Sequence, residues 1–386
     1  MNYSKWLIKM FLMLLGTLLF VLIANYTIDP YGIYNTHLFD FKKITQSEKM
    51  RFIKPLMVEE IKPKSIILGT SRAEHGFNPN HPYFKKPSYN FALTSASMYE
   101  ATTNLKFAIK QGSLEQVLLV LDYRMFNDKN QKQLQEFESY FDGSKGRYHY
   151  LYSLDTFKDT LRTIFNTYKP FFMYHPEGHI VHEYEIAKIK KRGWQLENMN
   201  HYEKNYYKLL KPNYLYKDTQ RSSFKDFDEF IHLCYQNSIK LEIIFGPSHI
   251  RQWEALAYYL GENTFAKWKR DVLFRVEKIA KEHYLPPYPI TDFSIYHLLT
   301  SEPMPNRGEI MNYYYDASHY NQKLGTIVLD TLNDNAIYKG FGVKIDSQNI
   351  EQHLAHQSEI KKNFINVKCY KEEIFGTKKL TTKEQK

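Results

Sequence analysis

The most strongly apolar part of the chain lies near its N-terminus. Residues 10–24 carry no charge, and with the flanking residues to Ile28 the stretch reaches about 19–22 residues, enough to cross a bilayer. Two lysines precede it and no acidic residue occurs before Asp29, a bias that predicts a cytoplasmic N-terminus. A buried core helix is the alternative, although such helices rarely run this long without polar residues. We therefore predict a transmembrane signal anchor over residues 1–28, uncleaved because Ala24-Asn25-Tyr26 is a poor cleavage site.

Beyond residue 63, short apolar runs alternate with amphipathic stretches. The runs that predict strands are Ile66–Leu68, Tyr89–Leu93, Val117–Leu121, Leu241–Phe245 and Ile290–Phe293. The stretches that predict helices are Ser97–Gln111, Phe224–Asn237, Thr264–Tyr284 and Asn321–Leu332. Apolar strands separated by helices are typical of a parallel sheet covered on both faces. The predicted fold class is therefore α/β, a three-layer, flavodoxin-like parallel sheet with helices on both faces.

The same pattern divides the remainder of the chain into parts. Residues 29–63 are predicted to be a connector with one short amphipathic helix, at Met50–Ile61, whose basic side chains, including Lys54, should face lipid headgroups or solvent. Residues 64–335 form the α/β domain. Residues 127–222 interrupt it with polar and aromatic sequence, which we expect to form a helical insertion that covers the carboxyl edge of the sheet and contacts substrate. Residues 336–386 are predicted to be a polar, Lys-rich tail.

Composition narrows the class of partner. With 43% hydrophobic residues in 386, the chain has enough apolar sequence for a core and is not a disordered protein. A formal charge of +10 is compatible with nucleic acid, a phospholipid surface or an acidic polymer. The membrane anchor argues against nucleic acid, so we expect the membrane and an anionic or sugar polymer as partners, and no cofactor. The two cysteines, Cys234 and Cys369, show no disulfide framework, and we expect them not to pair.

Candidate chemistry begins where the first predicted strand ends, in Gly69-Thr70-Ser71. Open α/β sheets place their sites at the carboxyl ends of their strands, and this ending would present a hydroxyl there. The alternative is that Thr70 or Ser71 only caps the following helix, which is a common use of these residues.

A serine nucleophile needs a base, and the base needs a group that orients it. Asp316 and His319 are three residues apart, just before the last predicted helix. This spacing lets the carboxylate orient the imidazole while the other ring nitrogen faces a serine from elsewhere in the chain. By itself the Asp-x-x-His pattern is weak, and it gains weight from the Gly-x-Ser at the first strand.

Together, Gly69, Thr70, Ser71, Asp316 and His319 resemble the motifs of the SGNH hydrolase superfamily. The arrangement is most similar to membrane-anchored, extracytoplasmic members of the type that includes the D-alanine-transfer proteins of the teichoic-acid pathway and the polysaccharide O-acetyltransferases. The resemblance covers roughly residues 20–125 and 240–335. It implies that Ser71 is the nucleophile, His319 the general base and acid, and Asp316 its orienting partner.

The chain departs from the superfamily at its second and third motifs. The second strand ends in Asn90-Phe-Ala-Leu-Thr-Ser95, without the family's glycine, and the third ends in Leu121-Asp-Tyr123, without Gly-x-Asn-Asp. The oxyanion would still need about two donors. We expect the Ser71 N–H to be one, and Asn90 or the backbone near Ser95 to be the other. Arg72 is expected either to bind an anionic substrate group or to form a structural ion pair.

A rival constellation occurs within the insertion. Histidines at positions 175, 179 and 182, followed by Glu183, have spacings that can bind zinc. An intervening proline and glycine disrupt the helix that this spacing requires, so we expect no metal site.

The resemblance and the anchor lead to one main functional expectation. The protein would be a single-pass inner-membrane protein with an extracytoplasmic serine esterase or O-acyltransferase domain. It would act on a cell-envelope polysaccharide through an acyl-Ser71 intermediate. A membrane acyl-transfer protein is a candidate partner. The alternative is a non-catalytic envelope protein that keeps the fold as a binding or assembly module.

Overall fold

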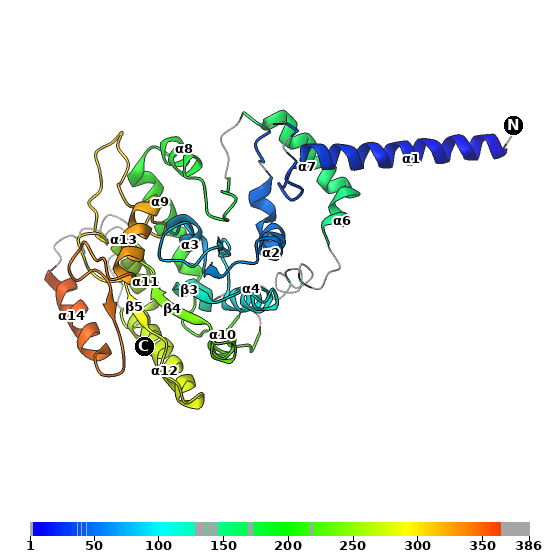
Figure 1. Ribbon diagram of the computed structural model, residues 1–386. Helices are drawn as coiled ribbons and strands as arrows, with labels where there is room; N and C mark the ends of the chain where they lie inside the picture. Colours follow the sequence, from blue (N-terminus) through cyan, green and yellow to red (C-terminus); the bar gives the residue numbers. More distant parts are fainter. Residues whose placement is uncertain are drawn as a thin grey trace.

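A six-stranded sheet forms the centre of the protein, with strand order β2-β1-β3-β4-β5-β6. The computed structural model (Figure 1) describes residues 3–36, 38–39, 41–43, 45–127, 137, 141, 146–168, 173–216 and 219–363. The strands are β1 (Ser65–Leu68), β2 (Ser88–Asn90), β3 (Gln116–Leu121), β4 (Lys240–Phe245), β5 (Ile290–Asp292) and β6 (Val343–Lys344). Five of these pair in parallel, which confirms the mostly parallel α/β sheet predicted from the apolar runs.

Helices cover both faces of this sheet and extend from one end of it. The helices that pack in the α/β domain are α3 (Ser71–Gly76), α4 (Met98–Lys110), α10 (Ser223–Gln236), α11 (Ile250–Leu260), α12 (Thr264–Glu282) and α13 (Gln322–Leu332). The others are α1 (Tyr3–Ile28), α2 (Met50–Ile61), α6 (Arg147–Leu151), α7 (Leu154–Asn166), α8 (Glu183–Lys191), α9 (Gln195–Tyr206) and α14 (Ile350–Asn363). Single 3-10 turns lie at Gln46–Lys49, Tyr123–Phe126 and Tyr207–Leu209.

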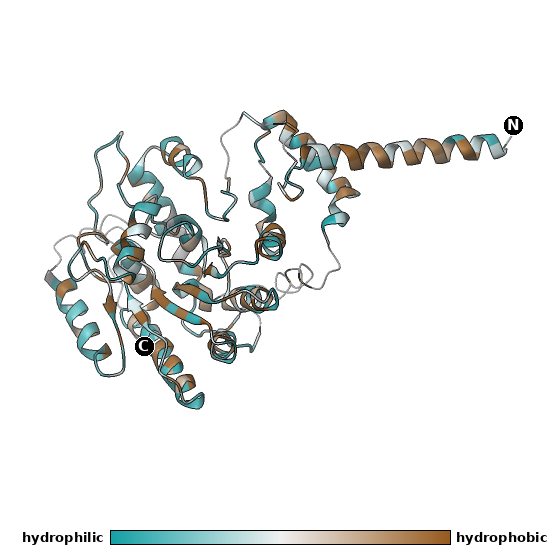
Figure 2. Ribbon diagram, in the orientation of Figure 1, coloured by the Kyte–Doolittle hydropathy of each residue, from teal (hydrophilic) through white to brown (hydrophobic). Residues whose placement is uncertain are grey.

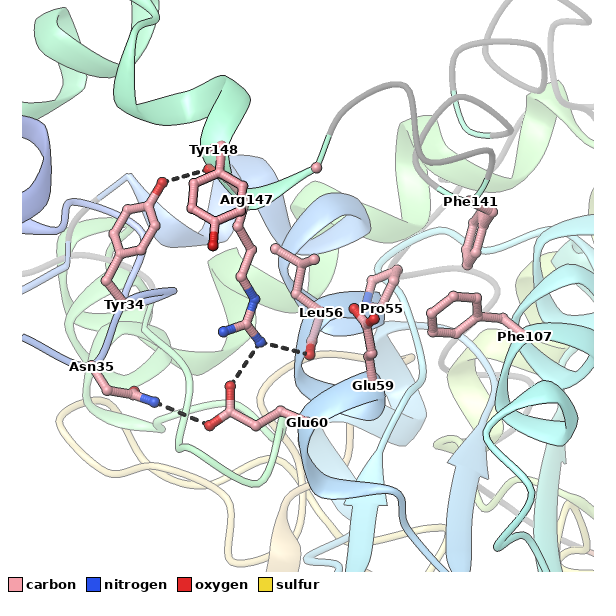
Figure 3. Close-up of a pocket in the computed structure, with 11 residues that line it drawn as sticks. Tyr34, Asn35, Pro55, Leu56, Glu59, Glu60, Phe107, Phe141, Arg147 and Tyr148 are labelled. Carbon is pink, nitrogen blue, oxygen red and sulfur yellow. Dashed lines mark hydrogen bonds and ion pairs between the residues drawn. The ribbon is translucent and has the colours of Figure 1, made fainter. Parts of the chain in front are cut away.

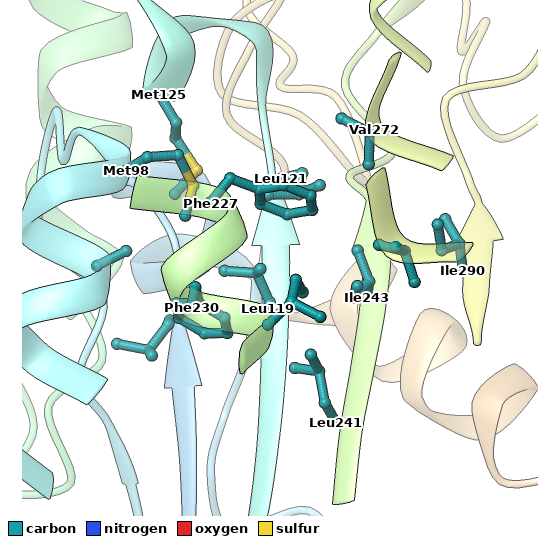
Figure 4. Packing of buried hydrophobic residues seen from close by; sticks show 14 of the residues in the cluster. Met98, Leu119, Leu121, Met125, Phe227, Phe230, Leu241, Ile243, Val272 and Ile290 are labelled. Carbon is teal, nitrogen blue, oxygen red and sulfur yellow. The ribbon is translucent and has the colours of Figure 1, made fainter. Parts of the chain in front are cut away.

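Successive side chains of each strand point to opposite faces of the sheet, which separates the hydrophobic core into two layers. Leu119 and Leu121 point to one face, where they pack with residues of α4, α10 and α12 (Figure 4). Leu118 and Val120 point to the other face and pack with residues of α3 and α13. Because successive side chains of a strand face opposite ways, an apolar strand needs a cover on each side. The three-layer arrangement follows from this requirement.

The C-terminal part differs from the predicted polar tail. Strand β6 adds to the edge of β5 in the antiparallel direction, and α14 follows it. Phe341, Ile345 and Ile350 are buried against the domain. Isolated apolar residues in a polar stretch carry no periodic signal, so the sequence pattern could not show that this segment completes the sheet. Of the cysteines, Cys234 is buried in α10 without a disulfide, and Cys369 lies outside the described residues.

Helix α1 projects away from the rest of the protein (Figure 1) and is apolar along most of its length (Figure 2). It has 26 residues and is long and apolar enough to cross a membrane. Only Val21, Asn25 and Ile28 are buried, all near its C-terminal end. Most of its apolar surface therefore has no cover within the described part of the chain, unlike that of a core helix.

The connector helix α2 has the predicted bounds, although the environment predicted for its basic residues is wrong. Lys54 is fully buried and its ammonium lies 2.8 Å from Glu74 Oε1. Arg51 pairs with Glu100 of α4 at 2.7 Å. Sequence periodicity does not show where the partner carboxylates lie, so these residues were placed at the surface by default.

Two glycines allow α3 and α13 to approach each other closely. A Cβ added at Gly325 of α13 would lie 1.7 Å from the carbonyl oxygen of Gly76 in α3. One added at Gly76 would lie 2.1 Å from the ring of Tyr320. Since α13 begins just after His319 and α3 begins at Ser71, this contact sets the distance between two of the predicted site residues.

We predict that Gly325→Ala destabilises the protein by about 3 kcal/mol or more, because a backbone-to-backbone clash cannot be relieved by a rotamer change. The substitution would otherwise favour the helix by about 1 kcal/mol. The midpoint of thermal unfolding of the detergent-solubilised protein measures the effect. Gly146→Ala is the control, since nothing lies within 4 Å of an added Cβ there. Equal midpoints for the two variants would contradict the close contact.

Candidate active site

Ser71 is the first residue of α3 and follows the turn that ends β1. Gly69 makes this turn with φ +155°, and a Cβ there would lie 2.8 Å from the carbonyl oxygen of Val120 and 2.9 Å from Ala73 Cβ. Glycine is therefore required where β1, β3 and α3 converge. The result is a half-buried hydroxyl at the carboxyl edge of the sheet, where open α/β folds place their sites.

Thr70 and Ser71 have different roles. The Thr70 side chain caps α3 by accepting a hydrogen bond from the Arg72 N–H, and its hydroxyl donates to Asp122. Arg72 Nη1 lies 2.7 Å from Asp122 Oδ2, and both side chains are buried. Asp122 follows β3, so this pair fastens the start of α3 to the neighbouring strand. This geometry favours the structural ion pair for Arg72 over a contact with substrate.

The Asp316–His319 segment is a tight loop held from several sides. It is closed by a bridge between Tyr314 and Tyr320. From the loop after β4, the His249 N–H donates to the Ala317 carbonyl at 3.0 Å. Two side chains of α9, Gln195 and Asn198, donate to the Tyr315 carbonyl. The loop is thus positioned by elements distant in sequence, in addition to its own spacing.

The structure brings Ser71, His319 and Asp316 together. Ser71 Oγ lies 2.8 Å from His319 Nε2. On the other side of the ring, His319 Nδ1 lies 2.8 Å from Asp316 Oδ2 and 3.0 Å from Oδ1. Both contacts are within hydrogen-bond reach, which is the geometry that nucleophile, base and orienting acid require.

Electrostatics assigns the proton positions. Burial alone would raise the pKa of the Asp316 carboxyl, but the neighbouring His319 ring and its hydrogen bonds to that carboxyl lower the pKa below its ordinary value. The carboxylate also accepts from the backbone N–H groups of Ser318 and His319. An ionised carboxylate only accepts hydrogen bonds, so Nδ1 carries the ring proton and Nε2 can accept from the Ser71 hydroxyl.

His75 lies one helical turn beyond Ser71 and was not identified from the sequence. It is buried, and its ring centroid lies 4.9 Å from that of His319 and 5.6 Å from that of Tyr315. Burial, with the nearby His319 and His182 rings, lowers the pKa of His75 well below its ordinary value. His75 is therefore a neutral ring at neutral pH, and it packs edge to face against the His319 imidazole. Its i, i+4 spacing from Ser71 was the only available sequence signal.

The predicted oxyanion donors differ in their surroundings. The buried Asn90 amide donates to the carbonyls of Ala73 and Phe77, both at 2.9 Å, and a primary amide has only two such hydrogens. This places Asn90 as an anchor for α3. Ser95 is half-buried with φ +58°, in the loop that follows the bond from the Leu93 N–H to the Gly69 carbonyl. Among the described residues, no hydrogen bond engages the backbone N–H of Ser71 or of Ser95.

A buried ionic cluster surrounds Glu74 of α3. Glu74 accepts from Lys54 of α2, from the Tyr174 hydroxyl of the insertion at 3.1 Å, and from Thr94 Oγ1 at 2.7 Å. Burial lowers the pKa of Lys54, and the charge of Glu74 opposes that shift. The cluster connects the connector helix, α3, the insertion and the loop after β2.

Two described segments of the insertion reach the carboxyl edge of the sheet. The Asn90 N–H donates to the Glu177 carbonyl at 2.8 Å, and α9 holds the Asp316 loop as described above. Of the three histidines considered for zinc, His175 and His179 stack on each other, whereas His182 bonds to the Tyr315 hydroxyl. Within the described residues, no group of three or more His, Cys, Asp or Glu side chains is placed to hold a metal ion.

A separate pocket of about 770 Å³ is lined by residues of the connector and its helix α2, of α4 and of the start of α6 (Figure 3). Arg147 and Glu60 form an ion pair at 2.7 Å within it, and Tyr34, Phe107 and Phe141 supply aromatic walls. None of the triad residues lines this pocket. It is therefore distinct from the hydroxyl–imidazole–carboxylate site.

The buried cluster at Glu74 yields a stability prediction. Lys54→Met should cost about 3–5 kcal/mol, because it leaves the Glu74 carboxylate buried without its cation. Arg270→Met is the control at the exposed pair with Glu351, where solvent screening leaves little stability to lose. Thermal unfolding of the solubilised protein measures both. A loss for Lys54→Met no larger than the control would show that the cluster does not stabilise the site.

His75 yields a prediction about pH. His75→Phe should leave the acidic limb of the pH profile for fluorophosphonate labelling of Ser71 within about 0.3 unit of wild type, because a neutral His75 contributes no charge to His319. If His75 were charged in that range, its substitution would remove a positive charge whose ring centroid lies 4.9 Å from that of His319. Its removal would then move the limb to higher pH, which is the contrary result.

In comparisons with known proteins, no family model matches the sequence and no curated protein matches it. The site is therefore described by its own geometry, a serine hydroxyl, an imidazole and a buried carboxylate in hydrogen-bonded series at the carboxyl edge of a mostly parallel sheet.

Proposed function

We propose that this protein is a membrane-anchored serine esterase or O-acyltransferase of the SGNH type. Its substrate would be a cell-envelope polysaccharide or a similar polymer outside the inner membrane. The observation that carries the proposal is the 2.8 Å contact of Ser71 Oγ with His319 Nε2, with Asp316 on the far ring nitrogen. Ser71 lies more than 240 residues before Asp316 and His319 in the sequence, and the arrangement of the three side chains is the one that activates a serine nucleophile.

In the proposed reaction, the Ser71 oxygen attacks the carbonyl carbon of an acyl ester and its proton passes to His319 Nε2. The bond to the departing alkoxide breaks, and the alkoxide takes that proton from His319. An acceptor hydroxyl, from a sugar or water, then gives its proton to His319 and attacks the acyl-Ser71 ester. The acyl group leaves with the acceptor and Ser71 regains its proton, while Asp316 remains ionised and orients the ring.

The developing oxyanion would be stabilised by backbone donors. The Ser71 N–H is one, and the N–H in the Thr94–Ser95 loop is the other that we propose, because the Asn90 amide is committed to α3. Helix α1 supports the anchor, and a membrane protein that supplies the acyl group would fit this location.

One observation favours the alternative, a non-catalytic envelope module. The Asn90 amide and the Arg72 guanidinium are both held in internal contacts, so neither of these predicted side chains faces the oxyanion as a donor. A protein that retained the fold for binding or assembly could keep the triad contacts for stability alone.

Substitution of the triad distinguishes these functions. Ser71→Ala should lower ester hydrolysis at least about 10³-fold and abolish fluorophosphonate labelling, with the fold intact. His319→Ala should act similarly, and the double variant should be little worse than either, because the residues act as one unit. Asp316→Asn should cost less where other contacts keep the ring oriented.

Two measurements test these variants. One is hydrolysis of a generic ester by the purified protein, and the other is the acyl content of the envelope polymer in a complemented deletion strain. Ser113→Ala is the matched control, since Ser113 precedes β3 at the opposite edge of the sheet. Full complementation by Ser71→Ala would contradict the catalytic proposal and favour the non-catalytic assembly function.

A further inference from the structure

Helix α7 buries its polar face and exposes its apolar face, the reverse of most surface helices. Its buried residues are polar, namely Thr156, Asp159, Thr160 and Thr163. Its opposite face exposes Leu154 at 73%, Leu161 at 39% and Phe165 at 65%. A helix on the surface of a water-soluble protein buries its apolar stripe and exposes its polar one. The orientation of α7 therefore suits a non-aqueous surrounding on its outer side.

Specific hydrogen bonds fix this orientation. The Tyr31 hydroxyl donates to Asp159 Oδ2 at 2.8 Å, and Thr160 Oγ1 donates to Asn25 Oδ1 at 2.9 Å. The Asn25 amide also donates to the Leu151 carbonyl at 3.0 Å, just before α7 begins. Asn25 is the polar one of the three buried residues of α1. Since these bonds hold the polar face inward, rotation of α7 to hide its leucines would break them.

The exposed face of α7 is continuous with the surface of α1. Phe157 of α7 meets Phe20 of α1 edge to face, with ring centroids 5.9 Å apart. Figure 1 shows α7 beside the end of α1 that joins the rest of the protein. At 1.5 Å per residue, Phe20 lies about 12 Å along the axis from Ile28, which is within the stretch long enough to enter a bilayer. A membrane that receives α1 would therefore reach α7.

A turn beside α7 also exposes apolar side chains next to exposed lysines. The Lys42 N–H donates to Thr167 Oγ1 at 2.9 Å, which ties the connector to the end of α7. Leu38 and Phe39, a few residues earlier, are 65% and 51% exposed. Lys42 follows these residues in the chain, and Lys158 lies on the same face of α7 as Leu154 and Leu161. Both lysines are exposed, as expected where anionic headgroups meet acyl chains.

We propose that the outer face of α7, together with Leu38 and Phe39, lies in the interfacial layer of the same bilayer that α1 enters. The occupant of this face is lipid. The protein would then be held by one spanning helix and one helix lying in the membrane surface, which prevents the α/β domain from rotating freely about its anchor. The inference depends on insertion of α1 and is independent of the chemistry proposed for Ser71.

Lipid quenching of a site-specific fluorophore tests this directly. In the full chain carrying Cys369→Ser, with Cys234 buried, single cysteines replace Leu161, Phe165 or, as the control, Phe274 of α12. Phe274 is an equally large apolar residue, 67% exposed and on a different helix. Each variant is labelled with a nitrobenzoxadiazole and reconstituted into phosphatidylcholine–phosphatidylglycerol vesicles, with or without lipid brominated near the headgroup end of the acyl chain.

Labels at Leu161 and Phe165 should show blue-shifted emission and at least about twofold more quenching by brominated lipid than the label at Phe274. Equal quenching at all three positions would overturn the proposal. Blue-shifted emission at Leu161 and Phe165 without bromine quenching would also overturn it, since it would identify a protein, such as a second copy of this chain, as the cover. Flotation of the vesicles checks α1 insertion, and fluorophosphonate labelling of the same samples checks Ser71 separately.

Discussion

The burial of α3 is the constraint on which the site depends. Every residue of this helix after Ser71 is buried, and three of them, Arg72, Glu74 and His75, have polar or ionisable side chains. Buried charges are costly unless they are paired. Arg72 is paired with Asp122 after β3, and Glu74 is paired with Lys54 of the connector helix. A helix of six residues has little stability of its own, so these partners determine where Ser71 lies.

The same logic assembles the other half of the site. The Asp316 loop is fastened by the loop after β4 and by two amides of α9, while the helix that follows it touches α3 at Gly76 and Gly325. His319 therefore reaches Ser71 through contacts made by four separate elements. The insertion takes part in this assembly, because α9 and the Glu177 segment belong to it. It is therefore a structural part of the site.

The connector and α7 join the α/β domain to helix α1. Lys54 links the connector to the site helix, and Asn25, Tyr31 and Asp159 link α1 and the connector to α7. These bonds form a polar seam beneath an apolar outer face. If α7 lies in the bilayer surface as proposed, these hydrogen bonds would fix the orientation of the α/β domain relative to the membrane. The carboxyl edge of the sheet would then face the membrane at a constant angle.

The sequence by itself determined the elements whose signal is local. Apolar runs predicted the strands, helical periodicity predicted α4, α10, α12 and α13, and the uncharged run predicted α1, because each of these is a property of consecutive residues. Ser71, Asp316 and His319 were identified from residue type and motif. The tertiary structure brings these three residues within hydrogen-bond distance and places the His75 ring against that of His319. It also buries Lys54, uses the Asn90 amide to hold α3, and turns the polar face of α7 inward. Those outcomes depend on partners far away in sequence, and no pattern of neighbouring residues records which partner a buried polar group will meet.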